Sequence, residues 1–248
     1  MSQFYPYQLE DNLQHHARLG MVVLQTDETI EHDLHRLLPP EHATIYATRV
    51  PSASEVTKET LAKMASELPA VASLLPNSFT YQAVGYGCTS GTAVIGAQRI
   101  EELVKHGCQT ETVSNPLSAL IAACQQFGIQ RLAFLSPYLE SVSDQLRARM
   151  HEADIATPLF GTFNEEQEAN VARITGESII EAAVELGQQD ACDAVFLSCT
   201  NLRTLDVINE IEAKINKPVL SSNQVLAWHL AQLANLNLKH EEFGRLWQ

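Results

Sequence analysis

A strand-like run that ends in Cys-Thr occurs twice in this sequence. The first copy, at residues 83–92, reads AVGYGCTSGT, and the second, at residues 194–203, reads AVFLSCTNLR. In both copies an apolar run typical of a buried β-strand passes directly into a helical pattern. The repeat therefore predicts two similar strand-to-helix units, each of which delivers a cysteine at the end of its strand.

Strand and helix patterns alternate along the rest of the chain as well. Strands are expected at residues 21–26, 43–50, 79–86, 111–114, 131–136, 156–163, 193–198 and 218–222. Helices are expected at residues 28–38, 54–75, 91–106, 115–127, 137–153, 176–187, 202–215 and 224–234. Because the strands are continuous apolar runs, the pattern is typical of an α/β fold with parallel sheets covered by helices on both faces.

Ligands of such sheets bind at the carboxyl ends of the strands, and both cysteines of the repeat fall there. Cys88 and Cys199 are each expected at a strand-to-helix junction, where backbone N–H groups and the helix dipole lower the pKa of a thiol. Asp27 and Tyr138 follow the ends of two other strands. We therefore expect Cys88 and Cys199 to be a catalytic pair, with Asp27 and Tyr138 nearby.

Small polar residues follow both cysteines. Thr89, Ser90, Thr200 and Asn201 could cap the helices that start there, or could bind the oxygens of a carboxylate. The two roles are compatible, because a capping donor that faces a cleft can also contact a ligand. The other cysteines have no polar partner in view and are expected to be packing residues: Cys108, Cys124 and Cys192.

Composition excludes several classes of protein. The 248 residues carry a formal charge of -14, without the basic stripe that nucleic acids or anionic membranes require. No apolar run approaches the length of a membrane span, and no leading segment resembles a signal peptide. The five cysteines are an odd count without a secreted-domain spacing, so reduced thiols are expected. They include no CxxC pair, so no metal site is expected, and no glycine motif indicates nucleotide binding. A cytoplasmic location follows from these features.

Four motifs resemble a known superfamily. They are VGYGCTSG (Val84–Gly91), LSPY (Leu135–Tyr138), LSCTNL (Leu197–Leu202) and KPVLSSNQVLAW (Lys217–Trp228). On these motifs the chain resembles the Asp/Glu racemase superfamily, and within it the branch that holds maleate cis-trans isomerases and arylmalonate decarboxylases. The motifs span most of the chain.

The resemblance implies two Rossmann-like lobes related by a pseudo-twofold, with the site between them and no cofactor. An N-terminal lobe is expected over residues 1–110, completed by 218–248, and a second lobe over 111–217. A small carboxylate substrate is implied, together with a homo-oligomer, dimer or higher.

The resemblance also implies a mechanism. In the isomerases, the cysteine that matches Cys88 attacks an alkene carbon, the adduct rotates, and the cysteine that matches Cys199 transfers the proton. Thr89, Ser90, Thr200, Asn201 and Tyr138 would hold carboxylate or enolate oxygens. The alternatives are an amino-acid racemase of the Asp/Glu racemase type, an arylmalonate-type decarboxylase, and a non-catalytic metabolite-binding protein. Decarboxylases have glycine where this chain has the first cysteine, which disfavours that reaction.

One residue departs from the isomerase pattern. Isomerases of this branch carry an Asn after the first strand that helps to hold a substrate carboxylate, and Asp27 stands in that place here. An ionised Asp27 would repel a carboxylate and would suit an ammonium or an amide. The isomerases also use a second Asn, for which Asn164 and Asn170 are both candidates.

Overall fold

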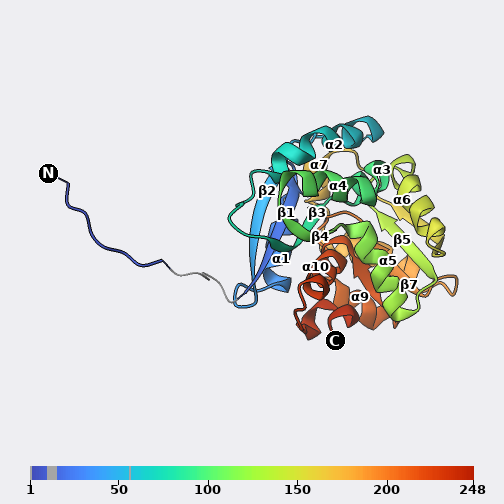
Figure 1. Ribbon diagram of the computed structural model, residues 1–248. Helices are drawn as coiled ribbons and strands as arrows, with labels where there is room; N and C mark the ends of the chain where they lie inside the picture. Colours follow the sequence, from blue (N-terminus) through green and yellow to red (C-terminus); the bar gives the residue numbers. More distant parts are fainter. Residues whose placement is uncertain (1, 10–15, 56) are drawn as a thin grey trace.

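The strands of this protein form two four-stranded sheets in which every pair is parallel, as shown by the computed structural model in Figure 1. The structure describes residues 2–9, 16–55 and 57–248. The first sheet contains β1 (Ala17–Leu24), β2 (Ala43–Val50), β3 (Tyr81–Gly87) and β4 (Thr110–Ser114). The second contains β5 (Arg131–Ser136), β6 (Ala156–Thr162), β7 (Ala194–Leu197) and β8 (Val219–Ser221).

The two sheets repeat one topology. Their strand orders are β2-β1-β3-β4 and β6-β5-β7-β8, so each strand of the first sheet has an equivalent in the second. Strands β3 and β7, which precede the two Cys-Thr pairs, occupy equivalent inner positions. The expected α/β fold with two parallel-sheet lobes and an internal repeat is confirmed.

Helices connect successive strands, as parallel pairing requires. They are α1 (Ile30–Leu37), α2 (Lys58–Ala72), α3 (Thr89–Ile95), α4 (Ala97–Gly107), α5 (Pro116–Phe127), α6 (Glu140–Glu152), α7 (Glu168–Val171), α8 (Gly176–Gly187), α9 (Ile208–Ile215) and α10 (Ser222–Leu233), followed by the 3-10 helices η1 (Glu241–Phe243) and η2 (Arg245–Trp247). Among the described residues, no helix is long and apolar enough to cross a membrane.

The C-terminal helix α10 connects the two halves of the molecule. It follows β8 of the second sheet, yet it packs against β3, β4 and α1 of the first half and against α5. Strand β4 pairs with β3, so the first sheet extends to Ser114, a few residues past the expected boundary at 110/111. Strand β8 pairs with β7, so the second sheet extends to Ser221, a few residues past the expected boundary at 217/218. The division of the chain into lobes at 110/111 and 217/218 stays a prediction.

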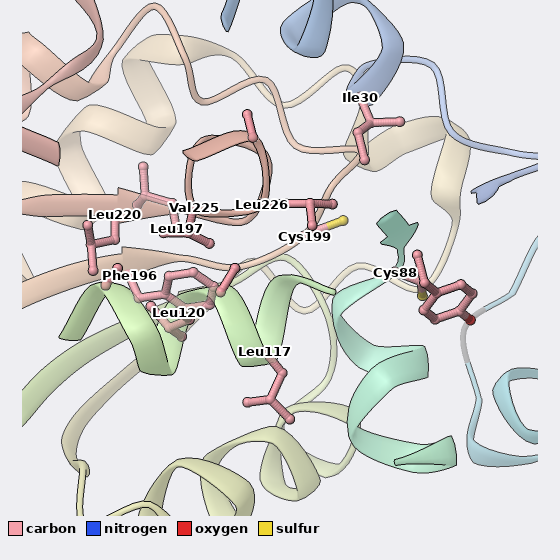
Figure 2. Packing of buried hydrophobic residues seen from close by; sticks show 14 of the residues in the cluster. Ile30, Cys88, Leu117, Leu120, Phe196, Leu197, Cys199, Leu220, Val225 and Leu226 are labelled. Carbon is pink, nitrogen blue, oxygen red and sulfur yellow. The ribbon is translucent and has the colours of Figure 1, made fainter. Parts of the chain in front are cut away.

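A single buried cluster of apolar side chains extends through both halves. The inner strands supply large side chains, such as Phe134 and Phe196, whose rings meet edge to face at 5.2 Å between centroids. Cys88 and Cys199 belong to the same cluster, and Figure 2 shows both at one end of it, near Ile30. Packing against this core therefore fixes the positions of both cysteine side chains.

The expected elements differ from the structure at several places. The helix expected over 54–75 is shorter, since α2 runs from Lys58 to Ala72. The helix expected over 91–106 is divided at Gly96, whose φ of 93° no ordinary helical residue adopts. Residues 202–207 form a bend, an irregular stretch and a turn at 205–207, so α9 starts only at Ile208. Helix α6 starts at Glu140, and Tyr138 lies in the loop before it. The polar connection expected over 164–170 contains the start of the short helix α7.

Gly107→Ala tests the close packing of α2 against α4. A Cβ on Gly107 would lie 2.7 Å from the Cβ of Ala72 and would also meet the carbonyl oxygen of Pro69. Alanine gains about 1 kcal/mol in helix propensity. Overpacking costs about 1–3 kcal/mol, and a backbone carbonyl cannot rotate out of the way. We expect urea denaturation to show a free energy of unfolding lowered by about 1–2 kcal/mol.

His106→Ala provides the control, because His106 is exposed in the same last turn of α4. It should change the free energy of unfolding by less than about 0.5 kcal/mol. A Gly107→Ala protein as stable as the wild type would show that the two helices separate at no cost.

Candidate active site

Cys88 lies at the end of β3 and caps α3. Its Sγ accepts a hydrogen bond from the backbone N–H of Gly91 at 3.2 Å. Gly91 permits this approach, since a Cβ there would lie 2.8 Å from Sγ and 2.6 Å from the hydroxyl oxygen of Tyr86. Cys88 is 5% exposed, and burial raises the pKa of its thiol to about 12 despite the Gly91 N–H.

Cys199 follows β7 at the equivalent place, but no helix starts beside it. Its φ is 112°, a strained value for a residue with a Cβ. Its backbone N–H donates to Ser222 Oγ at 3.0 Å, and its Sγ accepts the N–H of Asn201 at 3.3 Å. Burial, with the charge of Glu168 second, raises the pKa of the Cys199 thiol well above its usual value.

The lowered thiol pKa values expected from the sequence are therefore wrong for both cysteines in this structure. Their N–H bonds favour the thiolate, but burial outweighs these bonds. The nearby carboxyls of Glu168 and Asp27 add to the upward shift, because a thiolate beside a carboxylate is disfavoured. Both thiols are consequently held as neutral S–H groups.

The two cysteines line one pocket. The cavity that they line has a volume of about 10 Å³, which is room for about one water molecule. The residues that line it are Leu24, Asp27, Leu61, Cys88, Thr89, Ser90, Tyr138, Glu168, Cys199 and Thr200. The structure thus brings together seven of the eight residues expected from the sequence: Asp27, Cys88, Thr89, Ser90, Tyr138, Cys199 and Thr200.

A chain of hydrogen bonds extends from Cys199 into the protein. The Tyr138 hydroxyl lies 2.9 Å from Cys199 Sγ and donates to Glu168 Oε1 at 2.6 Å. The other carboxyl oxygen of Glu168 accepts from Asn201 Nδ2 at 2.9 Å. Since a hydroxyl carries a single proton, a Tyr138 that donates to Glu168 accepts the S–H of Cys199. The order of donors is therefore Cys199 to Tyr138 to Glu168.

Burial shifts the protonation of this chain. It raises the pKa of Glu168, although the bonds from Tyr138 and Asn201 oppose the shift. Burial also raises the pKa of Tyr138 well above its usual value, so its hydroxyl keeps its proton. Glu168 is thus a carboxyl with a raised affinity for a proton, one hydroxyl away from a thiol.

Asp27 supplies a second buried carboxyl. Its Oδ1 accepts the N–H groups of Thr29 and Ile30, both at 2.8 Å, at the start of α1. Its Oδ2 is buried and has no hydrogen-bond partner among the described residues. The nearby Thr200 hydroxyl favours the charged carboxylate, but it donates to the Gly87 carbonyl oxygen at 3.3 Å. Burial is the largest effect and raises the pKa of Asp27.

Asn201 is not among the residues that line this pocket. Its side-chain amide donates to Glu168 and accepts the N–H of Glu28 at 2.8 Å. Its backbone carbonyl oxygen accepts from Thr29 Oγ1 at 2.9 Å. Its amide is therefore fully used in holding loops together.

Neither Asn164 nor Asn170 faces the pocket, since both are exposed and Asn170 donates to Glu165 Oε2. Glu168, from the same segment, reaches the pocket instead, and sequence reasoning missed it. The one sequence signal for the burial of Glu168 is Val171, an apolar residue three positions later and therefore on the same helical face.

The described residues lack the side-chain groupings that hold metal ions. Among residues 2–9, 16–55 and 57–248, no group of three or more His, Cys, Asp or Glu side chains is placed to hold a metal ion. What the pocket does contain is two thiols, two carboxyls, one tyrosine and three hydroxyl side chains.

Known proteins share this fold. A Nocardia farcinica maleate cis-trans isomerase, solved as a mutant with a covalently bound succinylcysteine intermediate, matches with a TM-score of 0.84 at 23% identity, over 93% of this chain and 98% of that chain. A Pseudomonas putida maleate isomerase variant solved with maleate matches with a TM-score of 0.82 at 20% identity, over 93% of this chain and 97% of that chain.

In sequence, the chain is 24% identical over 238 residues to a maleate isomerase of Geobacillus stearothermophilus, covering 90% of this chain and 93% of that protein. It is 26% identical over 132 residues to an arylmalonate decarboxylase of Bordetella bronchiseptica, covering 52% and 55%. The profile of the family described as arylmalonate decarboxylase matches residues 36–247. With a match over most of its length, the chain belongs to the arylmalonate decarboxylase family, within the Asp/Glu racemase superfamily.

Proposed function

We propose that this protein is a cofactor-independent isomerase of a small carboxylate that uses Cys88 and Cys199 from two sides of its substrate. The observation that carries the proposal is the placement of both thiols. They come from the ends of equivalent strands, β3 and β7, and line the same pocket. The similarity to maleate isomerases over most of the chain supports the same reaction type.

The reaction needs one nucleophile and one proton donor. In alkene isomerisation, the Cys88 thiolate forms a C–S bond to one alkene carbon while Cys199 gives its proton to the other. Rotation about the resulting single bond follows. The C–S bond then breaks, the proton returns to Cys199 and the thiolate is restored, so atoms and charge balance. The thiol of Cys88 must first lose its proton, and the bases that line the pocket are Asp27 and Glu168.

The hydrogen-bond chain gives Cys199 a route for its proton. In alkene isomerisation Cys199 keeps its proton until it gives it to the alkene carbon. Where Cys199 must act as a base, as in racemisation, its proton first passes to Tyr138 while the Tyr138 proton passes to Glu168, which leaves a thiolate and a carboxylic acid. The charge in the pocket is unchanged by this transfer, so no buried cation is needed to stabilise the thiolate. The raised pKa of Glu168 favours its role as the acceptor.

Hydroxyl groups provide donors for the carboxylate of the substrate. Thr89, Ser90 and Thr200 line the pocket beside the two cysteines. The Thr89 hydroxyl donates to Ser222 Oγ at 2.8 Å, and Ser222 in turn accepts the backbone N–H of Cys199, so one serine links both cysteine loops. We assign the Ser90 hydroxyl to the carboxylate or enolate oxygens. Thr89 and Thr200 can join it only by turning their protons away from Ser222 Oγ and the Gly87 carbonyl oxygen.

A second candidate reaction is racemisation at a Cα carbon, with the two thiols as opposed acid and base. The unpartnered Oδ2 of Asp27 favours it, because an ammonium group would satisfy that oxygen. Decarboxylation needs only the proton-donating cysteine and leaves Cys88 without a role. A metabolite-binding protein without activity is the remaining alternative. A cytoplasmic location and a homo-oligomer stay predictions from the sequence.

Exchange and isomerisation followed by NMR in D2O test the two-cysteine mechanism. The substrates are maleate, maleamate, single amino acids and their derivatives. Alkene isomerisation identifies a cis-trans isomerase, and Cα exchange without it identifies a racemase.

Cys88→Ala and Cys199→Ala should each lower turnover by about 10²–10⁴-fold or more, because each removes an acid, base or nucleophile.

Cys108→Ala is the matched control, since Cys108 is buried outside the pocket. It should retain wild-type turnover, and all three variants should keep a cooperative thermal transition. A Cys88→Ala protein that remains active would contradict the mechanism.

Glu168→Gln tests the proton route. A carboxyl accepts a proton only when it is ionised, so kcat/KM should fall as the pH drops through a Glu168 pKa that is higher than usual. Glutamine cannot accept the proton, and the variant should lose about 10- to 100-fold in kcat together with that acidic limb. The measurement is kcat/KM against pH, with the substrate found by NMR.

Tyr138→Phe interrupts the same route and should give the same loss. Glu166→Gln, an exposed neighbour on the same segment, should leave the profile unchanged. An acidic limb that persists in Glu168→Gln would assign it to another group.

A further inference from the structure

Two of the ten residues that line the pocket are carboxylic acids, and none of those described there carries a positive charge. Asp27 and Glu168 are the carboxyls, and the remaining ionisable groups are two thiols and the Tyr138 hydroxyl. Asp27 and Glu168 are 4% and 5% exposed, so solvent screens their charges little. A dicarboxylate would bring two further negative charges into this space.

The two carboxyls differ in what they can still bind. Both oxygens of Glu168 are engaged, one by Tyr138 and the other by Asn201. Asp27 has only Oδ1 engaged, by two backbone N–H groups that fix the orientation of the carboxyl. Its buried Oδ2 has no partner among the described residues, and a buried acceptor without a partner is costly. A ligand that donates a hydrogen bond to Oδ2 recovers that cost.

We propose that the substrate carries one carboxylate and, at the other end, a nitrogen group that donates N–H to Asp27 Oδ2, either an ammonium or a carboxamide. The inference rests on the proposed function for the small-carboxylate end, which the hydroxyl of Ser90 would hold. Asp27 favours a nitrogen group over a second carboxylate on the substrate. Glu168 strengthens this preference, because it is a second buried carboxyl in the same pocket. Dicarboxylates such as maleate are consequently poor ligands of this pocket.

Binding of matched ligand pairs tests the proposal without requiring turnover. Maleate and maleamate share one carbon skeleton and differ only in a carboxylate replaced by a carboxamide. Succinate and 4-aminobutanoate compare a carboxylate with an ammonium. Calorimetry at about pH 8, where the carboxylates of the ligands are ionised, should show the nitrogen-bearing member of at least one pair binding about tenfold or more tighter.

Asp27→Asn should reverse this preference. Asparagine keeps an Oδ1 that accepts from Thr29 and Ile30, and it places an NH₂ donor where Oδ2 lies. The variant should therefore bind maleate more tightly than maleamate. Asp206→Asn removes an exposed carboxylate outside the pocket and should leave the wild-type preference intact.

Three results would overturn the proposal. The first is a wild-type protein that binds maleate as tightly as maleamate and also binds succinate as tightly as 4-aminobutanoate. The second is an Asp27→Asn protein that folds and keeps the wild-type ratio of affinities. The third is a wild-type protein that binds none of the four compounds at millimolar concentration. If Asp27→Asn does not fold, the wild-type ratios decide. Preferred binding of the nitrogen ligands without isomerisation or exchange would leave this inference standing and contradict the proposed function.

Discussion

The side chain of Asn201 holds together the loops from which the pocket is built. Its Oδ1 accepts the N–H of Glu28 in the loop after β1, and its Nδ2 donates to the Glu168 carboxylate and, at 3.1 Å, to the Glu168 carbonyl oxygen. Glu168 in turn receives the hydroxyl of Tyr138 from the loop after β5, and its N–H donates to the Ser54 carbonyl oxygen of the first half. Because Asn201, Glu168 and Tyr138 are buried, the bonds among these three are costly to leave unmade, and the loops are fixed relative to one another.

This network also determines the electrostatics of the site. It holds Glu168 next to Tyr138 and Cys199, and the start of α1 holds Asp27 in the same pocket, with no cation among the described lining residues. The thiols therefore stay neutral until a proton can pass to a carboxyl. The same acidity that suppresses the thiolate makes the pocket unsuited to a dicarboxylate. Substrate choice and thiol activation thus depend on the same two carboxyls.

Local pattern predicted the strands and most helices, because buried apolar runs and capping residues act over a few residues. It placed Cys88 and Cys199 at equivalent strand ends, and the structure agrees. It missed the division of a helix at Gly96 and the non-helical segment over 202–207, where a single backbone angle or a tertiary contact decides. It also missed Glu168, because an acidic residue in a polar segment gives no local sign of burial.

The sequence by itself determined the fold class, the family and the two cysteines, since repeated strand-to-helix units can form only a few parallel-sheet arrangements. It also placed Asp27 at a strand end. Only the tertiary structure decided the ionisation of the thiols, the partners of Tyr138 and the assignment of Asn201 to loop contacts. Burial and charge neighbours set these properties, and both depend on residues such as Glu168 that are remote in the chain and come together only when the two sheets pack.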